Sequence, residues 1–405
     1  MNGTTVPRRL APVLLAIALA ILAAAGPIAA QPIPPTDPFY AAPANPAALA
    51  NGAIIDSRPI NLLGLPIPLP VRAWQVKYKS LDGSGHPTTG VTTIVVPSTP
   101  WTGPGARPLL SHQLAEDSLG TECAPSFALA HGLSARINNG NAEAPLAVIA
   151  LQRNWAVAFP DYQGPRARFL DKSQAAHSVL DSLRAARSFA PADLGSAPVG
   201  LAGYSGGALA SVWAAQAQPE YAPELPLAGL AVGGVPFGLD EVVGHVRGTM
   251  NAGLGFLVLA AMHRLSPDSG IPALLNDKGK RMLAETENYC GFEFILRYMF
   301  ADVDDFTIEP DIGTAQPIRA IARRIDVDAA TPPSMPTYFW HSSEDDVLPI
   351  EAADRLAASW CRPGGQLTYV RTGDPTHATS GMLGLPAALE YLGRRFAGSP
   401  ATARC

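Results

Sequence analysis

A serine in a glycine-rich turn is the residue best suited to covalent chemistry. The segment Gly203-Tyr204-Ser205-Gly206-Gly207 has the pattern G-x-S-x-G and lies between an apolar run at 199–202 and a helix-forming run at 208–216. Such a strand–turn–helix context is what a nucleophile elbow requires. Its outer glycines lack the β-carbons that would collide where strand and helix meet. We therefore predict that Ser205 is a nucleophile, against the alternative of an ordinary glycine-rich turn.

A serine hydroxyl needs a base to take its proton, and that base needs a carboxylate to orient it. After a nucleophile elbow these partners follow in the chain order acid, then histidine. Three adjacent acids, Glu344, Asp345 and Asp346, follow a predicted strand at 336–341, and ligand sites form outside the carboxyl ends of strands. Of the eight histidines, only His377 lies beyond the next predicted strand. We predict His377 as general base and one of the three acids as its partner.

The elements around these residues alternate between strands and helices. Short runs that are apolar throughout are typical of strands buried on both faces, and residues 171–189 carry apolar side chains at helical spacing. The alternation indicates a mostly parallel central sheet with helices on both faces, and an opening hairpin adds antiparallel strands at one edge. The fold class is α/β. Strands are predicted at 73–78, 91–96, 108–113, 155–160, 199–203, 228–235, 336–341 and 366–370.

Between the strands at 228–235 and 336–341 the sequence becomes helical and amphipathic, which indicates a helical cap inserted into the α/β domain. The sequence contains no internal repeat. The predicted division is a signal peptide, an extended N-terminal segment, an α/β domain in two parts and a cap: 1–30, 31–70, 71–237 with 324–405, and 238–323.

The first thirty residues have the composition of a secretory signal peptide. Arg8 and Arg9 form a positive n-region, residues 10–25 are almost purely apolar, and small residues precede Gln31. Sixteen apolar residues fall short of the ~20 that cross a bilayer. We therefore predict cleavage and secretion, against the alternative of an uncleaved membrane anchor.

The four cysteines fit an exported chain. Cys123, Cys290, Cys361 and Cys405 lie far apart, and no C-x-x-C pair or His/Cys cluster indicates a zinc site. An even number of cysteines in a secreted protein predicts two disulfides, and spacing alone leaves three connectivities open. We predict no metal and no cofactor.

Composition excludes several other classes of function. Of 405 residues, 47% are hydrophobic and 16% are charged, which is typical of a globular chain rather than a disordered one. The formal net charge is −5 and no basic run occurs. We therefore expect no binding to nucleic acid and no attachment to anionic lipid by charge.

Four further segments accompany the elbow. They are Asp117-Ser118 followed by residues 123–126, the segment 160–164 with the sequence PDYQG, residues 345–349 in a D-x-V-x-P pattern, and the end of the chain from 384 to 398. In this order they resemble the secretory lipase family of α/β-hydrolases, over residues 66 to about 398. The resemblance implies the α/β-hydrolase fold with a helical cap or lid insertion. Its D-x-V-x-P pattern selects Asp345 as the acid that orients His377.

The resemblance also implies an oxyanion hole. No H-G-G-G loop occurs here. In this family a carboxyl side chain in the loop after the third strand donates instead, which falls on Asp117, together with the backbone N–H of Gly206. An aspartate donates only when it is protonated, so its site must raise its pKa. The alternative for Asp117 is a helix N-cap. The implied disulfides are Cys123–Cys290 and Cys361–Cys405.

The cap should determine which substrates enter. Its run from Gly253 to Met262 is apolar nearly all round, and it is too short to span a bilayer. We predict that Leu254, Phe256 and Leu257 line an acyl pocket. The alternatives are a buried helix of the cap and a lid that opens on a lipid surface.

These observations predict a secreted, triacylglycerol lipase-like carboxylic ester hydrolase that works through an acyl-enzyme. Its expected partner is a lipid or ester substrate, including one at a lipid–water interface, and we expect a monomer without a permanent membrane anchor. One alternative is an esterase or acyltransferase acting on short or unusual acyl groups. The other is a catalytically silent lipid-binding protein, which a complete triad disfavours because a binder gains nothing from a strained serine turn.

Overall fold

A nine-stranded sheet runs through the computed structural model, which describes residues 34–63, 70–132, 136, 143–361 and 366–404. The strand order is β1-β2-β3-β5-β4-β6-β7-β8-β9. Neighbours from β1 to β5 in this order pair antiparallel, and neighbours from β5 to β9 pair parallel. The strands are β1 Ile54–Pro59, β2 Val71–Leu81, β3 Pro87–Pro97, β4 Leu109–Gln113, β5 Ala156–Pro160, β6 Val199–Tyr204, β7 Leu227–Gly233, β8 Thr337–Ser342 and β9 Leu367–Thr372.

The central strands β4 and β6 lie at a topological switch point. The chain leaves β4 toward β5 on one side and leaves β6 toward β7 on the other. Ligand sites in open α/β sheets form outside the carboxyl ends of the strands at such a point. The loops that follow β4 and β6 are therefore where a site is expected.

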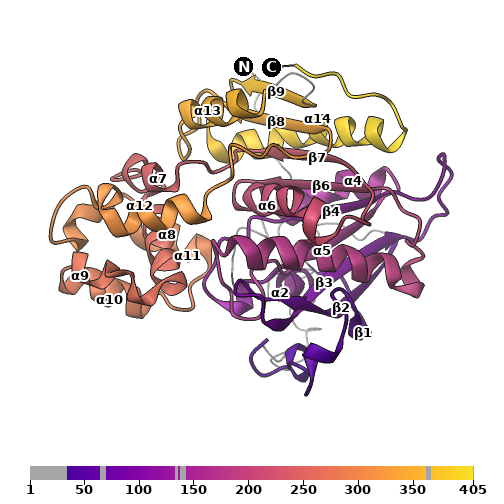
Figure 1. Cartoon of the computed structure of the whole chain (residues 1–405), viewed down its shortest axis with the longest axis horizontal. Helices are drawn as coiled ribbons and strands as arrows, with labels where there is room; N and C mark the ends of the chain where they lie inside the picture. Colours follow the sequence, from indigo (N-terminus) through magenta and orange to yellow (C-terminus); the bar gives the residue numbers. More distant parts are fainter. Residues whose placement is uncertain (1–33, 64–69, 133–135, 137–142, 362–365, 405) are drawn as a thin grey trace, which may run out of the picture.

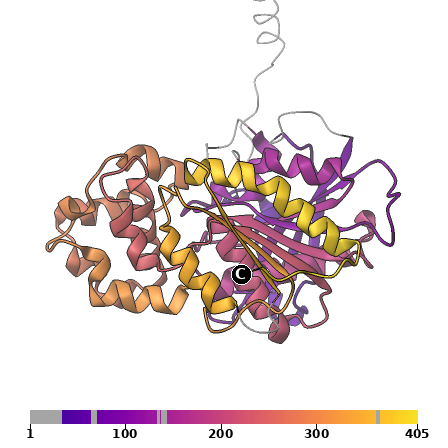
Figure 2. The ribbon, with the colours of Figure 1, turned by 90° about the horizontal axis from the view of Figure 1, so that it is seen from above.

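Helices cover both faces of the sheet (Figure 2). Alternate residues of a strand point to opposite faces, so Val199 and Leu201 of β6 pack with α5 and α6, whereas Ala202 packs with α14. The predicted hairpin and mostly parallel sheet are confirmed, and β1 is an additional strand within the segment predicted as extended. The helices are α2 Pro125–His131, α4 Val148–Gln152, α5 Lys172–Ser188, α6 Gly206–Tyr221, α13 Ile350–Trp360 and α14 His377–Phe396.

Helices α7 to α12, here named the cap, follow β7 and gather beside the sheet (Figure 1). They are α7 Leu239–His245, α8 Ala252–Leu265, α9 Ile271–Leu274, α10 Asp277–Glu285, α11 Gly291–Tyr298 and α12 Gln316–Ile325. Helices α8 and α11 cross closely at Gly253. A β-carbon at this position would overlap the backbone of Phe294, so the crossing needs a glycine here. The boundaries of the predicted domains remain predictions.

The predicted signal peptide, residues 1–30, and Cys405 lie outside the described residues. In the part of the chain that the structure describes, no helix combines the length and apolar character needed to span a bilayer.

Candidate active site

Ser205 occupies a strained turn between β6 and α6. Its φ of 53° and ψ of −124° lie in a backbone region that residues other than glycine rarely adopt. Its backbone N–H donates to Gly233 O at 3.0 Å and so continues the hydrogen bonding between β6 and β7. The turn requires glycines on both sides, because a β-carbon on Gly203 would overlap the Gly207 backbone and one on Gly207 would overlap Gln113 O. The turn thus places Ser205 at the carboxyl end of β6, as the sequence predicted.

The structure brings His377 and Asp345 together. His377 begins α14 after β9, Asp345 follows β8, and Nδ1 of His377 lies 2.7 Å from Oδ2 of Asp345. Oδ1 of Asp345 accepts from the backbone N–H groups of Val347 and Leu348 at 2.9 and 2.8 Å. Burial opposes the charge of Asp345, but His377 and the Leu348 N–H outweigh it and hold the pKa of this carboxyl below its usual value.

This contact determines which nitrogen of His377 can act as a base. An ionised Asp345 accepts a hydrogen bond from Nδ1–H of His377. In the neutral imidazole this tautomer leaves a lone pair on Nε2. Among the described residues Nε2 is buried without a hydrogen-bond partner. Tyr204, which precedes Ser205, donates from Oη to His377 O at 2.7 Å, and its ring centroid lies 4.8 Å from the imidazole. The elbow itself therefore holds the histidine next to it.

Asp117 lies in the loop after β4, on the other side of the elbow. Its side chain is buried, its φ is 38°, and a β-carbon on Gly206 would overlap Oδ1 of Asp117. The carboxyl group and the N–H of Gly206 at the start of α6 are thus close together. A protonated carboxyl and a helix N-terminal N–H can both donate to one developing oxyanion.

The PDYQG segment after β5 holds this loop in place. Oη of Tyr162 accepts from the Glu116 N–H at 3.1 Å. The side-chain amide of Gln163 accepts from the Asp117 N–H at 3.0 Å and donates to Ser118 O at 2.7 Å, once its oxygen and nitrogen are assigned to suit these partners. Burial raises the pKa of Glu116 well above its usual value. The sequence pattern of this segment does not indicate these contacts.

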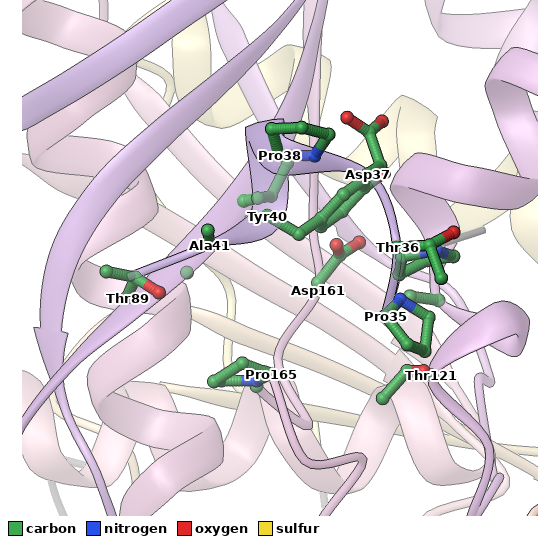
Figure 3. Close-up of a pocket in the computed structure, with 15 residues that line it drawn as sticks. Pro35, Thr36, Asp37, Pro38, Tyr40, Ala41, Thr89, Thr121, Asp161 and Pro165 are labelled. Atoms are coloured by element: carbon green, nitrogen blue, oxygen red, sulfur yellow. The ribbon is translucent and has the colours of Figure 1, made fainter. Parts of the chain in front are cut away.

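Asp161 of the same segment lines a separate cavity of about 350 Å³ under the N-terminal segment (Figure 3). Its carboxyl accepts from the N–H and Oγ of Ser126 at 2.8 and 2.5 Å, at the start of α2. Burial raises the pKa of Asp161 to about 7, although the hydrogen bonds from Ser126 lower it. Because both oxygens are occupied, we interpret Asp161 as a structural anchor for α2.

A disulfide ties the loop after β4 to the cap. Cys123 and Cys290 are bonded, with their Cα atoms 5.6 Å apart, which agrees with the pairing that the resemblance implied. Arg264 of α8 adds hydrogen bonds to Leu119 O at 2.7 Å and Ala167 O at 3.2 Å. Cys361 is also disulfide-bonded, but its expected partner Cys405 lies outside the described residues.

The three predicted acyl-pocket residues have different surroundings. Phe256 and Leu257 are buried in the core, and Phe256 stacks on Tyr298 with ring centroids 4.4 Å apart. Leu254 is only half-buried and packs against a small cluster. This cluster includes Val347 and Leu348, whose N–H groups hold Asp345, together with Val242 and Val246. Of the three, Leu254 is therefore the residue that packs against the same cluster as the Asp345 loop.

The two acids beside Asp345 in the sequence, Glu344 and Asp346, differ in burial and in contacts. Glu344 is exposed, whereas the half-buried Asp346 accepts from the His377 N–H and from the side chain of Asn251, each at 2.8 Å. In the sequence Asp346 is only an alternative to Asp345 as the acid, and no local signal indicates Asn251. Within the described ranges no group of three metal-ligating side chains occurs.

A mostly parallel sheet with an elbow after β6, an acid after β8 and a histidine after β9 defines an α/β-hydrolase. The profile of the secretory lipase family matches residues 131–404, and the chain belongs to this family. The predicted fold and the prediction of a lipase-like hydrolase are confirmed at this level.

Individual relatives agree over most of the chain. A Mycobacterium tuberculosis protein described as a probable inactive lipase is 34% identical over 91% of this chain and 84% of its own length. Lipase A of Moesziomyces aphidis is 28% identical over 93% of this chain and 83% of its own. The crystal structure of lipase A from Candida antarctica is similar with a TM-score of 0.82 and 27% identity, covering 93% and 89% of the two chains.

Proposed function

We propose that this protein is a secreted lipase that hydrolyses carboxylic esters of lipid-like acyl chains. The observation that carries the proposal is the 2.7 Å hydrogen bond between His377 and Asp345, held next to the strained elbow of Ser205 by Tyr204. Secretion is supported by the composition of residues 1–30 and by the secretory family to which the chain belongs.

In the proposed mechanism Oγ of Ser205 attacks the ester carbonyl while Nε2 of His377 takes its proton. The Gly206 N–H and a protonated Asp117 stabilise the oxyanion of the tetrahedral intermediate. His377 then gives the proton to the leaving alcohol, and the acyl group remains on Ser205. Water, activated by the same histidine, attacks this acyl-enzyme and releases the acid. Asp345 stabilises the imidazolium in both half-reactions.

An exposed apolar surface on the cap favours a lipid as substrate. Met250, Leu296, Met299 and Phe300 are large apolar residues with 36–65% of their surface exposed. The N–H of Phe300 donates to Thr249 O at 2.8 Å, so the segments around Met250 and Phe300 are neighbours. Met250 directly precedes Asn251, which contacts Asp346 beside the histidine. An apolar surface next to the triad would meet a lipid–water interface as substrate enters.

Two alternatives are tested together with the proposal. A silent lipid-binding protein is favoured by the 34% identity to a relative described as a probable inactive lipase. A fluorophosphonate probe should label the wild type and not the Ser205→Ala variant, and absence of labelling in both would favour the silent binder. A series of p-nitrophenyl esters separates the lipase from an esterase or acyltransferase on short acyl groups, which would prefer acetate or butyrate.

A further inference from the structure

Asp346 bridges the loop of the general base and the cap. Oδ1 accepts from the backbone N–H of His377 at 2.8 Å, and Oδ2 accepts from Nδ2 of Asn251 at 2.8 Å. Asn251 lies 95 residues earlier in the chain, at the start of α8. One carboxylate therefore contacts both the histidine's backbone and the N-cap residue of a cap helix.

The first contact supplies a partner that the helix itself lacks, and the second replaces an ordinary local one. His377 is the first residue of α14, where the backbone N–H has no partner within the helix, and a carboxylate there is also favoured by the helix dipole. Asn251 is the N-cap of α8, a position where asparagine usually accepts from its own helix. Its side chain makes no such bond and reaches Asp346 instead.

We propose that Asp346 is a positioning residue that couples the cap to the general base, through its paired hydrogen bonds to the His377 backbone and the Asn251 side chain. With α8 in place, Asn251 holds the Asp346 carboxylate, and that carboxylate holds the backbone from which the His377 imidazole extends. A cap that moved away from the base loop would release this restraint. The inference rests on the proposed function, because it assumes that His377 acts as the base.

The test is a double-mutant cycle read with a short, soluble ester that makes little contact with the cap. Asn251→Asp places a second carboxylate against that of Asp346, and the two repel each other. We expect kcat to fall at least about tenfold while KM changes less than about threefold. In an Asp346→Asn background the same change restores a carboxylate–amide pair, so it should then cost less than about twofold. Asn288→Asp adds the same charge at an exposed cap position and serves as the matched control.

The outcomes separate the inference from the proposed function. Equal losses from Asn251→Asp in both backgrounds, or no loss in either, would overturn the coupling, provided that a fluorophosphonate still labels the wild type and not Ser205→Ala. A wild type that is neither labelled nor active would overturn the proposed function and the coupling with it. Thermal unfolding of each variant distinguishes a loss of kcat from a loss of folded protein, because the proposal requires kcat to change among folded variants.

Discussion

Replacing Asp345 with asparagine is a direct test of the triad, because the structure dictates how the new amide must lie. Oδ1 accepts from the N–H groups of Val347 and Leu348 at 2.9 and 2.8 Å, so the amide oxygen must take this position. The NH2 group then replaces Oδ2, which lies 2.7 Å from Nδ1 of His377. Turning the amide over would oppose its NH2 to two backbone donors.

A donor facing Nδ1 forces the imidazole to carry its proton on Nε2. In that tautomer Nε2 has no lone pair for the serine proton, and the same error in another serine triad lowers kcat by ~10⁴. At 1.36 kcal/mol per factor of ten, this corresponds to about 5.4 kcal/mol of lost transition-state stabilisation. We expect Asp345→Asn to fold normally and to lose activity by about this factor.

The assay is the steady-state hydrolysis of p-nitrophenyl butyrate at neutral pH, with circular dichroism to verify folding. Glu344→Gln is the matched control, because Glu344 is exposed and its carboxyl accepts only from the adjacent Ser343 among the hydrogen bonds of the described residues. It should retain activity within about twofold. An Asp345→Asn variant within about tenfold of the wild type would refute the assignment of the acid.

Four further measurements test the remaining parts of the site. Asp117→Ala should lower kcat by ~10²–10³ while Asp117→Asn, which keeps a donor, loses much less, and equal losses would exclude donation to the oxyanion. Leu254→Trp should lower kcat/KM for long-chain esters at least about tenfold and leave acetate esters nearly unchanged. Equal losses on both would mean that Leu254 is merely core of the cap, and no loss on either would place the acyl pocket elsewhere. Replacing both Cys123 and Cys290 with alanine should lower the free energy of unfolding by about 2–4 kcal/mol in urea titrations, and an unchanged midpoint would contradict this. The pKa of Asp161 is about 7 in the folded protein, against an ordinary value of 3.8. Between these two pH values the folded state binds more protons than the unfolded state, so the free energy of unfolding should fall as the pH rises, by up to about 4 kcal/mol. Asp161→Asn should flatten that slope, and an unchanged slope would contradict the assignment.

The strands, the long helix α5 and the strained turn at Ser205 could be predicted because their signals are local. A buried strand is a short apolar run, a helix repeats its apolar face every few residues, and the elbow is five consecutive residues in a recognisable context. The histidine followed from chain order, since only His377 lies beyond the last predicted strand. The strand order of the sheet could not be read in the same way, because the insertion of β4 between β5 and β6 depends on pairing between distant segments.

The different contacts of Asp345 and Asp346 were decided by tertiary structure. Two adjacent residues of the same type have almost identical local sequence signals, and only a motif shared with a family favoured the first. In the folded protein one carboxylate faces the imidazole and the other faces the histidine's backbone and Asn251. Which acid does which depends on side-chain direction and on contacts across 31 to 95 residues of chain, and such long-range geometry has no periodic or local trace in the sequence.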